Sequence, residues 1–388
     1  MPWKETRPVD ERIQFIAAVA EDPRGNFARL CERFGISRAK GYKWLRRYEE
    51  LGAAGLEDQQ PVALTCPHRT PAMVIDRIVE LRKEHPFDGP KKLRARLLAT
   101  NDVELVVPAA STIGEILDRH GLIRPRRVRL RAPRSTQPLE EALAPNDLWA
   151  TDFKDHFACG DKTRCHPLTV SDDATRFLIK CEGLTEPREA PVREQFERAF
   201  REFGMPIRIR SDNGPPFATA AIGGLSRLSV WWIRLGIVPE RIEPGQPQQN
   251  GRHERMHRTL KQHTATPPAA SFVEQQRAFD RFRADYNDHR PHEALAQTPP
   301  SRHYHPSFRA MPAVLRELEY ADDIEIRRVK SNGIVSWQAT RFQVGTLLGG
   351  QPLGFRQIEE SVWEMLFGPV RLARVEAHGR DLRLAALR

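Results

Sequence analysis

The sequence predicts a multidomain chain: all-α helix-turn-helix modules at the N-terminus, a central α/β core with a mixed five-stranded sheet, and a small C-terminal β-barrel. Three observations predict this class. Helical periodicity with basic faces occurs at 9–52 and again within 70–123, strands and helices alternate after Asn146, and short strands separated by glycines occupy the region 320–388. The length of 388 residues suits two or three domains, and 40% hydrophobic residues can build their cores.

Composition excludes several classes of protein. No apolar run approaches the roughly 20 residues of a membrane span, and the first ten residues lack the apolar stretch of a signal peptide. The five cysteines are scattered and odd in number, which does not indicate a disulfide framework. No GxxxxGK[ST] phosphate loop occurs. We therefore expect a cytoplasmic protein with no membrane partner and no ATP hydrolysis of that type.

The net charge is +10, from 61 Lys and Arg against 51 Asp and Glu, with a pI near 9.6. A surplus of this size makes a polyanion a plausible partner if the cations cluster. The position of the cations along the chain therefore carries more information than their number.

Residues 1–58 predict a helix-turn-helix DNA-binding domain with three short helices. An apolar stripe lies on the second helix, Gly35 ends that helix, and Ser37 is a good N-cap for the third. The alternative is an ordinary three-helix bundle with a solvated basic face. Five cations within ten residues, with no acid between them, favour DNA binding, and they are the candidate contacts: Arg38, Lys40, Lys43, Arg46 and Arg47.

Residues 70–123 predict a second helical DNA-binding domain, of winged type. Pro71 suits the first turn of a helix that runs to about His85. A basic helix at 91–98 supplies Lys91 and Lys92 as candidate DNA contacts.

A basic linker follows at 124–145. Seven arginines and no acid lie within 119–134, and prolines there disfavour a regular helix. Such a run is usually a solvated linker, but between DNA-binding modules it can follow phosphates, with Arg126 and Arg127 as the candidate contacts.

An α/β region is expected at 146–305. Three strands come first and helices then alternate with strands, which suits a mixed sheet flanked by helices. The expected strands are 148–153, 165–171, 176–181, 207–212 and 237–243, and the expected helices are 188–203, 225–235, 248–264 and 271–287.

Three carboxylates in this region indicate the chemistry. Asp152 lies in the first strand, and Asp212 ends the fourth strand before an Asn-Gly turn. A carboxylate at the C-terminal end of a strand faces the crevice where open α/β sheets bind ligands. The third is Glu254, on a helix whose same face is expected to carry candidate DNA contacts and a histidine: Asn250, His257, Arg258 and Lys261. Met256 and Leu260 fall on the opposite side, which suits packing on the sheet.

Four separated segments resemble the integrase-core transposases of bacterial insertion sequences, a family similar to retroviral integrases. The matching segments are Trp149-x-x-Asp152, Ser211-Asp212-Asn213-Gly214-Pro215-Pro216-Phe217, Pro247-Gln248-Gln249-Asn250-Gly251-x-x-Glu254 and Tyr286-Asn287-x-x-Arg290-Pro291-His292. The resemblance implies an RNase H-like fold for 146–305. It also implies a catalytic, metal-binding triad of Asp152, Asp212 and Glu254.

The resemblance implies a metal cofactor, and the chemistry of three carboxylates agrees with it. Mg²⁺ and Mn²⁺ are hard cations that prefer oxygen ligands. Two such ions, expected with DNA bound, can stabilise the attacking and leaving oxygens of a phosphodiester displacement. Water is the nucleophile in cleavage, and the freed 3′-OH is the nucleophile in strand transfer.

Some residues offer weaker alternatives. The stretch between Asp212 and Glu254 is longer than in many family members, and we place the excess in the loop or helix at 223–229. Glu243 lacks the Asn-Gly context of Glu254. Asp172 and Asp173 could form a metal pair but are expected to cap a turn. A zinc site is disfavoured because the spacing is unusual for its candidates: His156, Cys159, Cys165 and His166.

The leading hypothesis is a DNA transposase that binds the terminal inverted repeats of its element and then target DNA. Joining two DNA ends implies a homodimer or higher homo-oligomer in a nucleoid-associated synaptic complex. One alternative is a sequence-specific DNA-binding regulator with a decayed, non-catalytic core, although decay would usually have removed a carboxylate. Another is an RNase H-type nuclease, which the helix-turn-helix disfavours. The region 320–388 would add DNA affinity or subunit contacts.

Overall fold

The computed structural model describes residues 8–23, 25–58, 69–100, 106–123, 139–243, 246–315, 317–338, 340–378 and 381–385. The chain forms two compact units, Met1–Arg69 and Thr70–Arg388. Arg126 and Arg127, and most of the predicted basic linker, lie outside the described residues. None of the described helices is long and apolar enough to cross a membrane.

The first unit contains the three expected helices. They are α1 (Pro8–Glu21), α2 (Phe27–Arg33) and α3 (Arg38–Leu51), followed by a 3-10 turn at Gly52–Leu56. Gly35 turns the chain with φ +64°, and the Ser37 hydroxyl accepts from the Lys40 N–H at 3.3 Å. Gly41 lets α3 lie close to α2, because a β-carbon there would be 2.6 Å from Cys31 Sγ.

The second unit begins with three helices around an apolar core that includes Ile78, Leu93 and Ile113. They are α4 (Ala72–Glu84), α5 (Pro90–Ala99) and α6 (Ala110–Arg119). Pro90 occupies the first turn of α5, where its missing N–H costs nothing. The described part of 70–123 contains helices and no strand, so the wing expected from the sequence is not seen there.

The central sheet has the order β4-β3-β1-β5-β6, with a two-residue β2 beside the start of β3. β1 pairs antiparallel with β3 and parallel with β5, and β5 pairs parallel with β6. All five expected strands are present, whereas β2 was not expected. Their bounds are β1 (Leu148–Phe153), β2 (Phe157–Ala158), β3 (Arg164–Asp172), β4 (Leu178–Leu184), β5 (Arg208–Ser211) and β6 (Val238–Arg241).

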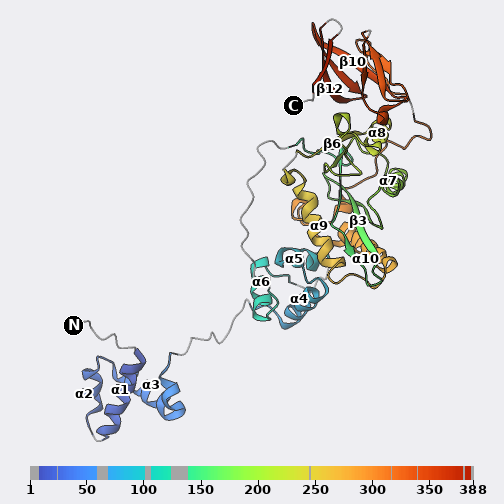
Figure 1. Ribbon diagram of the computed structural model, residues 1–388. Coiled ribbons are helices and arrows are strands. Elements are labelled where there is room, and N and C mark those ends of the chain that lie inside the picture. Colours follow the sequence, from blue (N-terminus) through green and yellow to red (C-terminus); the bar gives the residue numbers. More distant parts are fainter. Residues whose placement is uncertain are drawn as a thin grey trace. The chain divides into compact units, whose positions relative to one another are not determined.

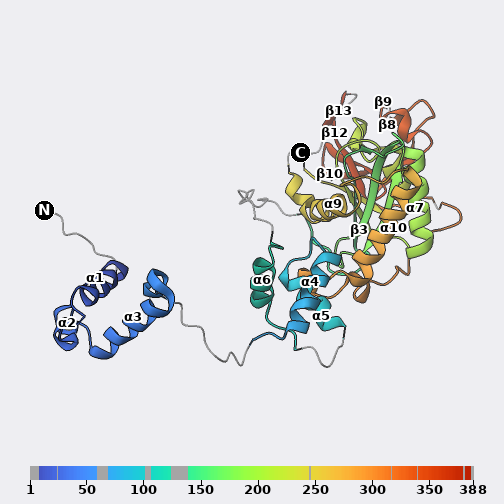
Figure 2. The same ribbon diagram turned by 90° about the horizontal axis from the view of Figure 1, so that it is seen from below.

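Helices cover both faces of this sheet (Figures 1 and 2). The pair α7 (Glu189–Phe203) and α8 (Arg227–Arg234) packs on one face through buried aromatic side chains. The pair α9 (Gly251–Thr264) and α10 (Phe272–Ala284) packs on the other, and α10 continues into a π-helical turn at Asp285–His289. The mixed sheet and its layers agree with the predicted RNase H-like core.

The C-terminal region is an open β structure, so the predicted barrel is not confirmed. Five antiparallel strands follow the order β13-β12-β11-β10-β7, and β8 and β9 form a separate hairpin. The hairpin covers the sheet instead of closing it, because Trp337 of β8 stacks on Phe355 of β10 at 4.6 Å. The bounds are β7 (Glu325–Arg328), β8 (Ile334–Trp337), β9 (Thr340–Gln343), β10 (Pro352–Glu359), β11 (Val362–Phe367), β12 (Val370–His378) and β13 (Asp381–Ala385).

The C-terminal strands pack directly on the catalytic core. Val230 and Ile233 of α8 belong to the apolar core of the β region, and Figure 1 shows α8 beside these strands. Gly223 lies against β12, where a β-carbon would be 2.8 Å from the Leu372 side chain. Gly223 begins the segment 223–229, to which we assigned the extra residues between Asp212 and Glu254. The start of this segment therefore lies where the core meets the C-terminal strands.

A buried ion network joins α5 to the end of the core. Asp88 is 1% exposed and pairs with Arg96 at 2.8 Å and with Arg290 at 3.2 Å. The two guanidinium groups hold the pKa of Asp88 below its usual range, although burial alone would raise it. Arg290 therefore has a structural partner inside the protein.

Candidate active site

The two predicted catalytic aspartates lie at one edge of the central sheet. Asp152 is next to last in β1, and Asp212 directly follows β5. Because β1 and β5 are parallel neighbours, the C-terminal ends of both strands meet at the same edge. The Asp212 turn is tight, since a β-carbon on Gly214 would lie 3.0 Å from Asp212 Oδ2.

The electrostatics of both aspartates are unusual. Burial and then the charge of Asp212 raise the pKa of Asp152 to about 7, against a hydrogen bond from the Phe153 N–H and the charge of Lys154. Burial also raises the pKa of Asp212, opposed by a hydrogen bond from the Gly214 N–H. Among the described residues, the buried Asp212 Oδ1 has no hydrogen-bond partner. Two crowded carboxylates with an unsatisfied oxygen favour a cation between them.

Glu254 lies in the first turn of α9, and its side chain is exposed. Its charge contributes a small increase to the pKa of Asp152, so the two carboxylates are within electrostatic range. In the part of the chain that the structure describes, no three His, Cys, Asp or Glu side chains converge closely enough to hold a metal ion. The two aspartates therefore offer oxygen donors of the kind that Mg²⁺ and Mn²⁺ prefer, and the exposed Glu254 side chain does not converge with them.

The buried face of α9 differs from the expected one. His257 was expected beside Glu254 on the exposed face, but its ring is buried, as is that of His253. The burial stripe runs through His253, Met256, His257, Leu260 and Thr264. This stripe follows the helical spacing i, i+3, i+4, i+7 and i+11, which was the signal in the sequence that could have revealed both histidines.

Both histidines reach polar side chains of β3. Thr169 Oγ1 lies 2.7 Å from His253 Nε2 and 2.6 Å from His257 Nε2. Ser171 Oγ lies 3.0 Å from His253 Nδ1, and His257 Nδ1 lies 3.8 Å from Asp152 Oδ2. Sequence reasoning did not identify this cluster.

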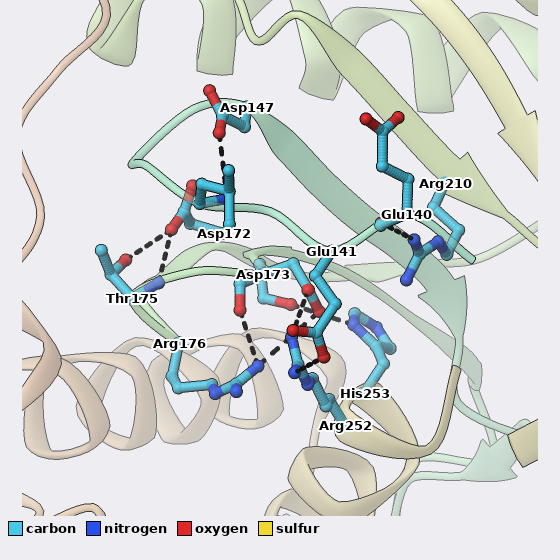
Figure 3. Close-up of polar contacts among 12 residues, drawn as sticks. Glu140, Glu141, Asp147, Asp172, Asp173, Thr175, Arg176, Arg210, Arg252 and His253 are labelled. Atoms are coloured by element: carbon cyan, nitrogen blue, oxygen red, sulfur yellow. Dashed lines mark hydrogen bonds and ion pairs between the residues drawn. The ribbon is translucent and has the colours of Figure 1, made fainter. Parts of the chain in front are cut away.

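The alternative metal pair, Asp172 and Asp173, is engaged within the chain. Asp172 accepts from the N–H and the hydroxyl of Thr175, which closes the expected turn, and from the Asn146 N–H. Asp173 Oδ2 lies 2.6 Å from the guanidinium of Arg252 at the start of α9. Figure 3 shows Arg252 reaching both Asp173 and Glu141.

Of the four residues weighed for a zinc site, the two cysteines lie in apolar surroundings. Cys159 and Cys165 are buried in the core between the sheet and α9–α10, and burial raises the pKa of both thiols. The rings of His156 and His166 stack obliquely at 5.2 Å. No metal-binding cluster forms from these side chains, all of which are described.

The basic residues of α3 divide into two groups. Arg38, Lys40, Lys43 and Arg46 are exposed. Arg47 is half-buried with its guanidinium 5.3 Å from the Trp44 ring, which Arg12 also covers at 4.0 Å.

The remaining predicted DNA contacts of the second unit differ in exposure. Arg258 and Lys261 are exposed on α9, whereas Asn250 is 6% exposed. Lys91 pairs with Glu293 at 2.7 Å. Burial and then the charge of Arg290 lower the pKa of Lys92 to about 8.

Comparison with known families identifies four matching regions. The integrase core domain matches residues 142–247, and a second integrase core domain family matches 235–300. A helix-turn-helix domain matches residues 11–61, and a homeodomain-like domain matches 40–117. The integrase-core matches cover both aspartates and Glu254.

Two curated relatives come from bacterial insertion elements. The chain is 29% identical over 247 residues to the insertion element IS407 uncharacterized 31.7 kDa protein of Burkholderia multivorans, a match that covers 62% of this chain and 85% of that protein. It is 31% identical over 246 residues to the insertion element IS476 uncharacterized 39.2 kDa protein of Xanthomonas euvesicatoria, covering 61% and 66%.

Among solved structures, the HTLV-2 integrase catalytic core domain in complex with magnesium aligns with a TM-score of 0.34 and 15% identity. The alignment covers 42% of this chain and 100% of that one.

Proposed function

The chain belongs to the integrase-core family of transposases from bacterial insertion sequences, and we propose that it is a DNA transposase that cuts its element ends and joins them to target DNA. The observation that carries this proposal is the pair of aspartates at the ends of β1 and β5. Burial and mutual repulsion raise the pKa of Asp152, and Asp212 keeps a buried oxygen without a partner among the described residues. Such a pair is suited to hold a divalent cation.

In this proposal Asp152 and Asp212 hold the cation, and Glu254 completes the donor set from α9. When bound, Mg²⁺ or Mn²⁺ polarises the phosphodiester and stabilises the charge that develops on its oxygens. The exposed Arg258 and Lys261 follow Glu254 along the same helix, where they would bind DNA phosphates and keep the backbone beside the carboxylates.

The first unit is proposed to recognise the terminal inverted repeats. Its third helix, α3, presents Arg38, Lys40, Lys43 and Arg46 to solvent, as a recognition helix must before it enters a major groove. Arg47 is proposed to stabilise Trp44 more than to contact DNA. Synapsis of two ends would require a homodimer or higher homo-oligomer.

A DNA-binding regulator with an inactive core is the second candidate function. The absence of three converging metal-ligand side chains among the described residues is the observation that favours it. The two functions differ in one respect only, which is whether the bound DNA is cut.

The test uses labelled duplexes that carry the inverted repeats flanking the reading frame. The transposase proposal expects cleavage at the element end with Mg²⁺ or Mn²⁺ and none with Ca²⁺, which binds with a looser geometry. The regulator alternative expects tight binding with no cleavage in any of the three metals. Cleavage that persists after chelation of all metal would contradict the proposed mechanism.

A further inference from the structure

The residues on either side of Glu254 bond to β3 and to the turn that follows it. Arg252 pairs with the buried Asp173 at 2.6 Å, and His253 and His257 both contact Thr169. Glu254 itself is exposed, so the helix is fixed by its neighbours and not by the carboxylate. We call Thr169, Ser171, His253 and His257 the Thr169 cluster.

The protons in the Thr169 cluster can be assigned from hydrogen-bonding capacity. A threonine hydroxyl carries one proton and two lone pairs. Thr169 Oγ1 donates to the Asp152 carbonyl at 3.2 Å, because that oxygen can only accept. Both histidines must then donate from Nε2 to the two lone pairs, and His253 Nδ1 accepts from the Ser171 hydroxyl at 3.0 Å. One arrangement of the protons therefore satisfies all of these hydrogen bonds.

The Thr169 cluster connects two of the proposed metal ligands. Thr169 is the cross-strand register partner of Asp152, and His257 Nδ1 lies 3.8 Å from Asp152 Oδ2. On α9, Glu254 directly follows His253 and precedes His257 by less than one turn. One hydroxyl therefore links the strand that carries the first aspartate to the helix turn that carries the glutamate.

Apolar packing alone would fix α9 less well. Met256 and Leu260 also pack against the sheet region, but apolar contacts tolerate a small slide of a helix. Hydrogen bonds at 2.6 and 2.7 Å do not, because a slide would leave buried histidine nitrogens without partners. The cluster thus determines the position of α9 along β3.

We propose that the Thr169 cluster is a positioning device that holds Glu254 at the place where it can share a divalent cation with Asp152. This inference rests on the proposed function, since it assumes that these carboxylates bind the cation. In it, Thr169, His253 and His257 are positioning residues and do not touch the DNA.

The test measures Mn²⁺ binding to the full chain from the electron paramagnetic resonance of the free ion, together with the melting temperature. Thr169→Val keeps the shape of the side chain and removes the hydroxyl, and Thr169→Ser restores it. We expect Thr169→Val to weaken Mn²⁺ binding about tenfold or more, as loss of outer contacts to metal ligands does. Thr169→Ser should bind Mn²⁺ nearly as well as wild type.

A folded Thr169→Val protein with wild-type Mn²⁺ affinity and only a lower melting temperature would overturn the proposal, because the cluster would then serve stability alone. If Thr169→Val does not fold, His257→Leu makes the same comparison, with the same expected loss and the same contradicting result. Asp152→Asn separates the two proposals. If it leaves Mn²⁺ binding unchanged, the proposed metal site fails. If it weakens binding and neither cluster variant does, only the positioning role fails.

Discussion

The two buried histidines of α9 make the second unit sensitive to acid. Burial lowers the pKa of His253 to about 4, against the charge of Asp173. Burial, then the charges of His253 and Lys154, lower the pKa of His257 to about 2. In the unfolded chain both rings take up a proton near pH 6.5, whereas in the folded protein they stay neutral. Since the unfolded state binds more protons, the free energy of unfolding falls as the pH falls below 6.5.

The size of the effect follows from these pKa values. Between pH 7 and pH 5, each histidine lowers the free energy of unfolding by about 2 kcal/mol. Asp152 acts in the opposite direction, because its folded pKa is about 7 and its unfolded pKa is near 3.8. Protonation of Asp152 in the folded state raises the free energy of unfolding by about 2 kcal/mol between pH 7 and pH 5. Together, the two histidines and Asp152 should therefore lower the free energy of unfolding by about 2 kcal/mol between pH 7 and pH 5.

Urea unfolding followed by tryptophan fluorescence at pH 7 and pH 5 tests this reasoning with two variants. His253→Gln removes one titrating ring. The amount by which the free energy of unfolding of wild type exceeds that of this variant should therefore be about 2 kcal/mol smaller at pH 5 than at pH 7. Asp152→Asn removes the opposing group and should increase the acid-induced loss by about 2 kcal/mol. A wild type to His253→Gln difference that is equal at both pH values would refute the assignment of a buried, neutral His253.

Three other predictions concern the remaining parts of the chain. Arg290→Met should lower the free energy of unfolding of the second unit by about 3 kcal/mol in urea, because the buried Asp88 loses a guanidinium partner; an unchanged midpoint would contradict the buried network. Gly41→Val should unfold the first unit and abolish its helical circular dichroism contribution, since its β-carbon would be 2.6 Å from Cys31 Sγ. Arg46→Ala should reduce the salt dependence of DNA binding, measured by anisotropy, by about one unit of slope; an unchanged slope would mean no phosphate contact.

Much of the fold could be predicted because its signals are local. Helical periodicity, the Ser37 cap and the glycine turn at Gly35 define the first unit from neighbouring residues alone. β1 begins with a short apolar run and β5 alternates isoleucine with arginine, and these patterns placed Asp152 within one strand and Asp212 at the end of another before their pairing was known. β2 contains two residues, which is too short for any periodicity.

What could not be predicted depends on contacts between distant segments. The sequence cannot show that Arg290 meets Asp88, or that Lys91 meets Glu293, because each pair is joined only by tertiary packing. The alternating strands after residue 320 suggested closure, but whether a sheet closes depends on where a hairpin packs, here through Trp337.

The histidines of α9 show how a helix face can be misassigned. The charged residues suggested that Glu254 and His257 share one exposed face, and 100° per residue places them near enough for that reading. Polar side chains on β3, Thr169 and Ser171, provide partners that make burial of two histidines favourable. Those partners lie more than 80 residues away in the sequence.

In the proposed function, Asp152, Asp212 and Glu254 act together in DNA joining. The most direct measurement is strand transfer of a pre-cut element end into plasmid DNA with Mn²⁺, for wild type, Asp152→Asn, Asp212→Asn and Glu254→Gln. DNA affinity is measured in parallel by anisotropy. We predict that each substitution abolishes joining while DNA binding stays nearly unchanged. A Glu254→Gln protein that joins DNA as fast as wild type would contradict the account.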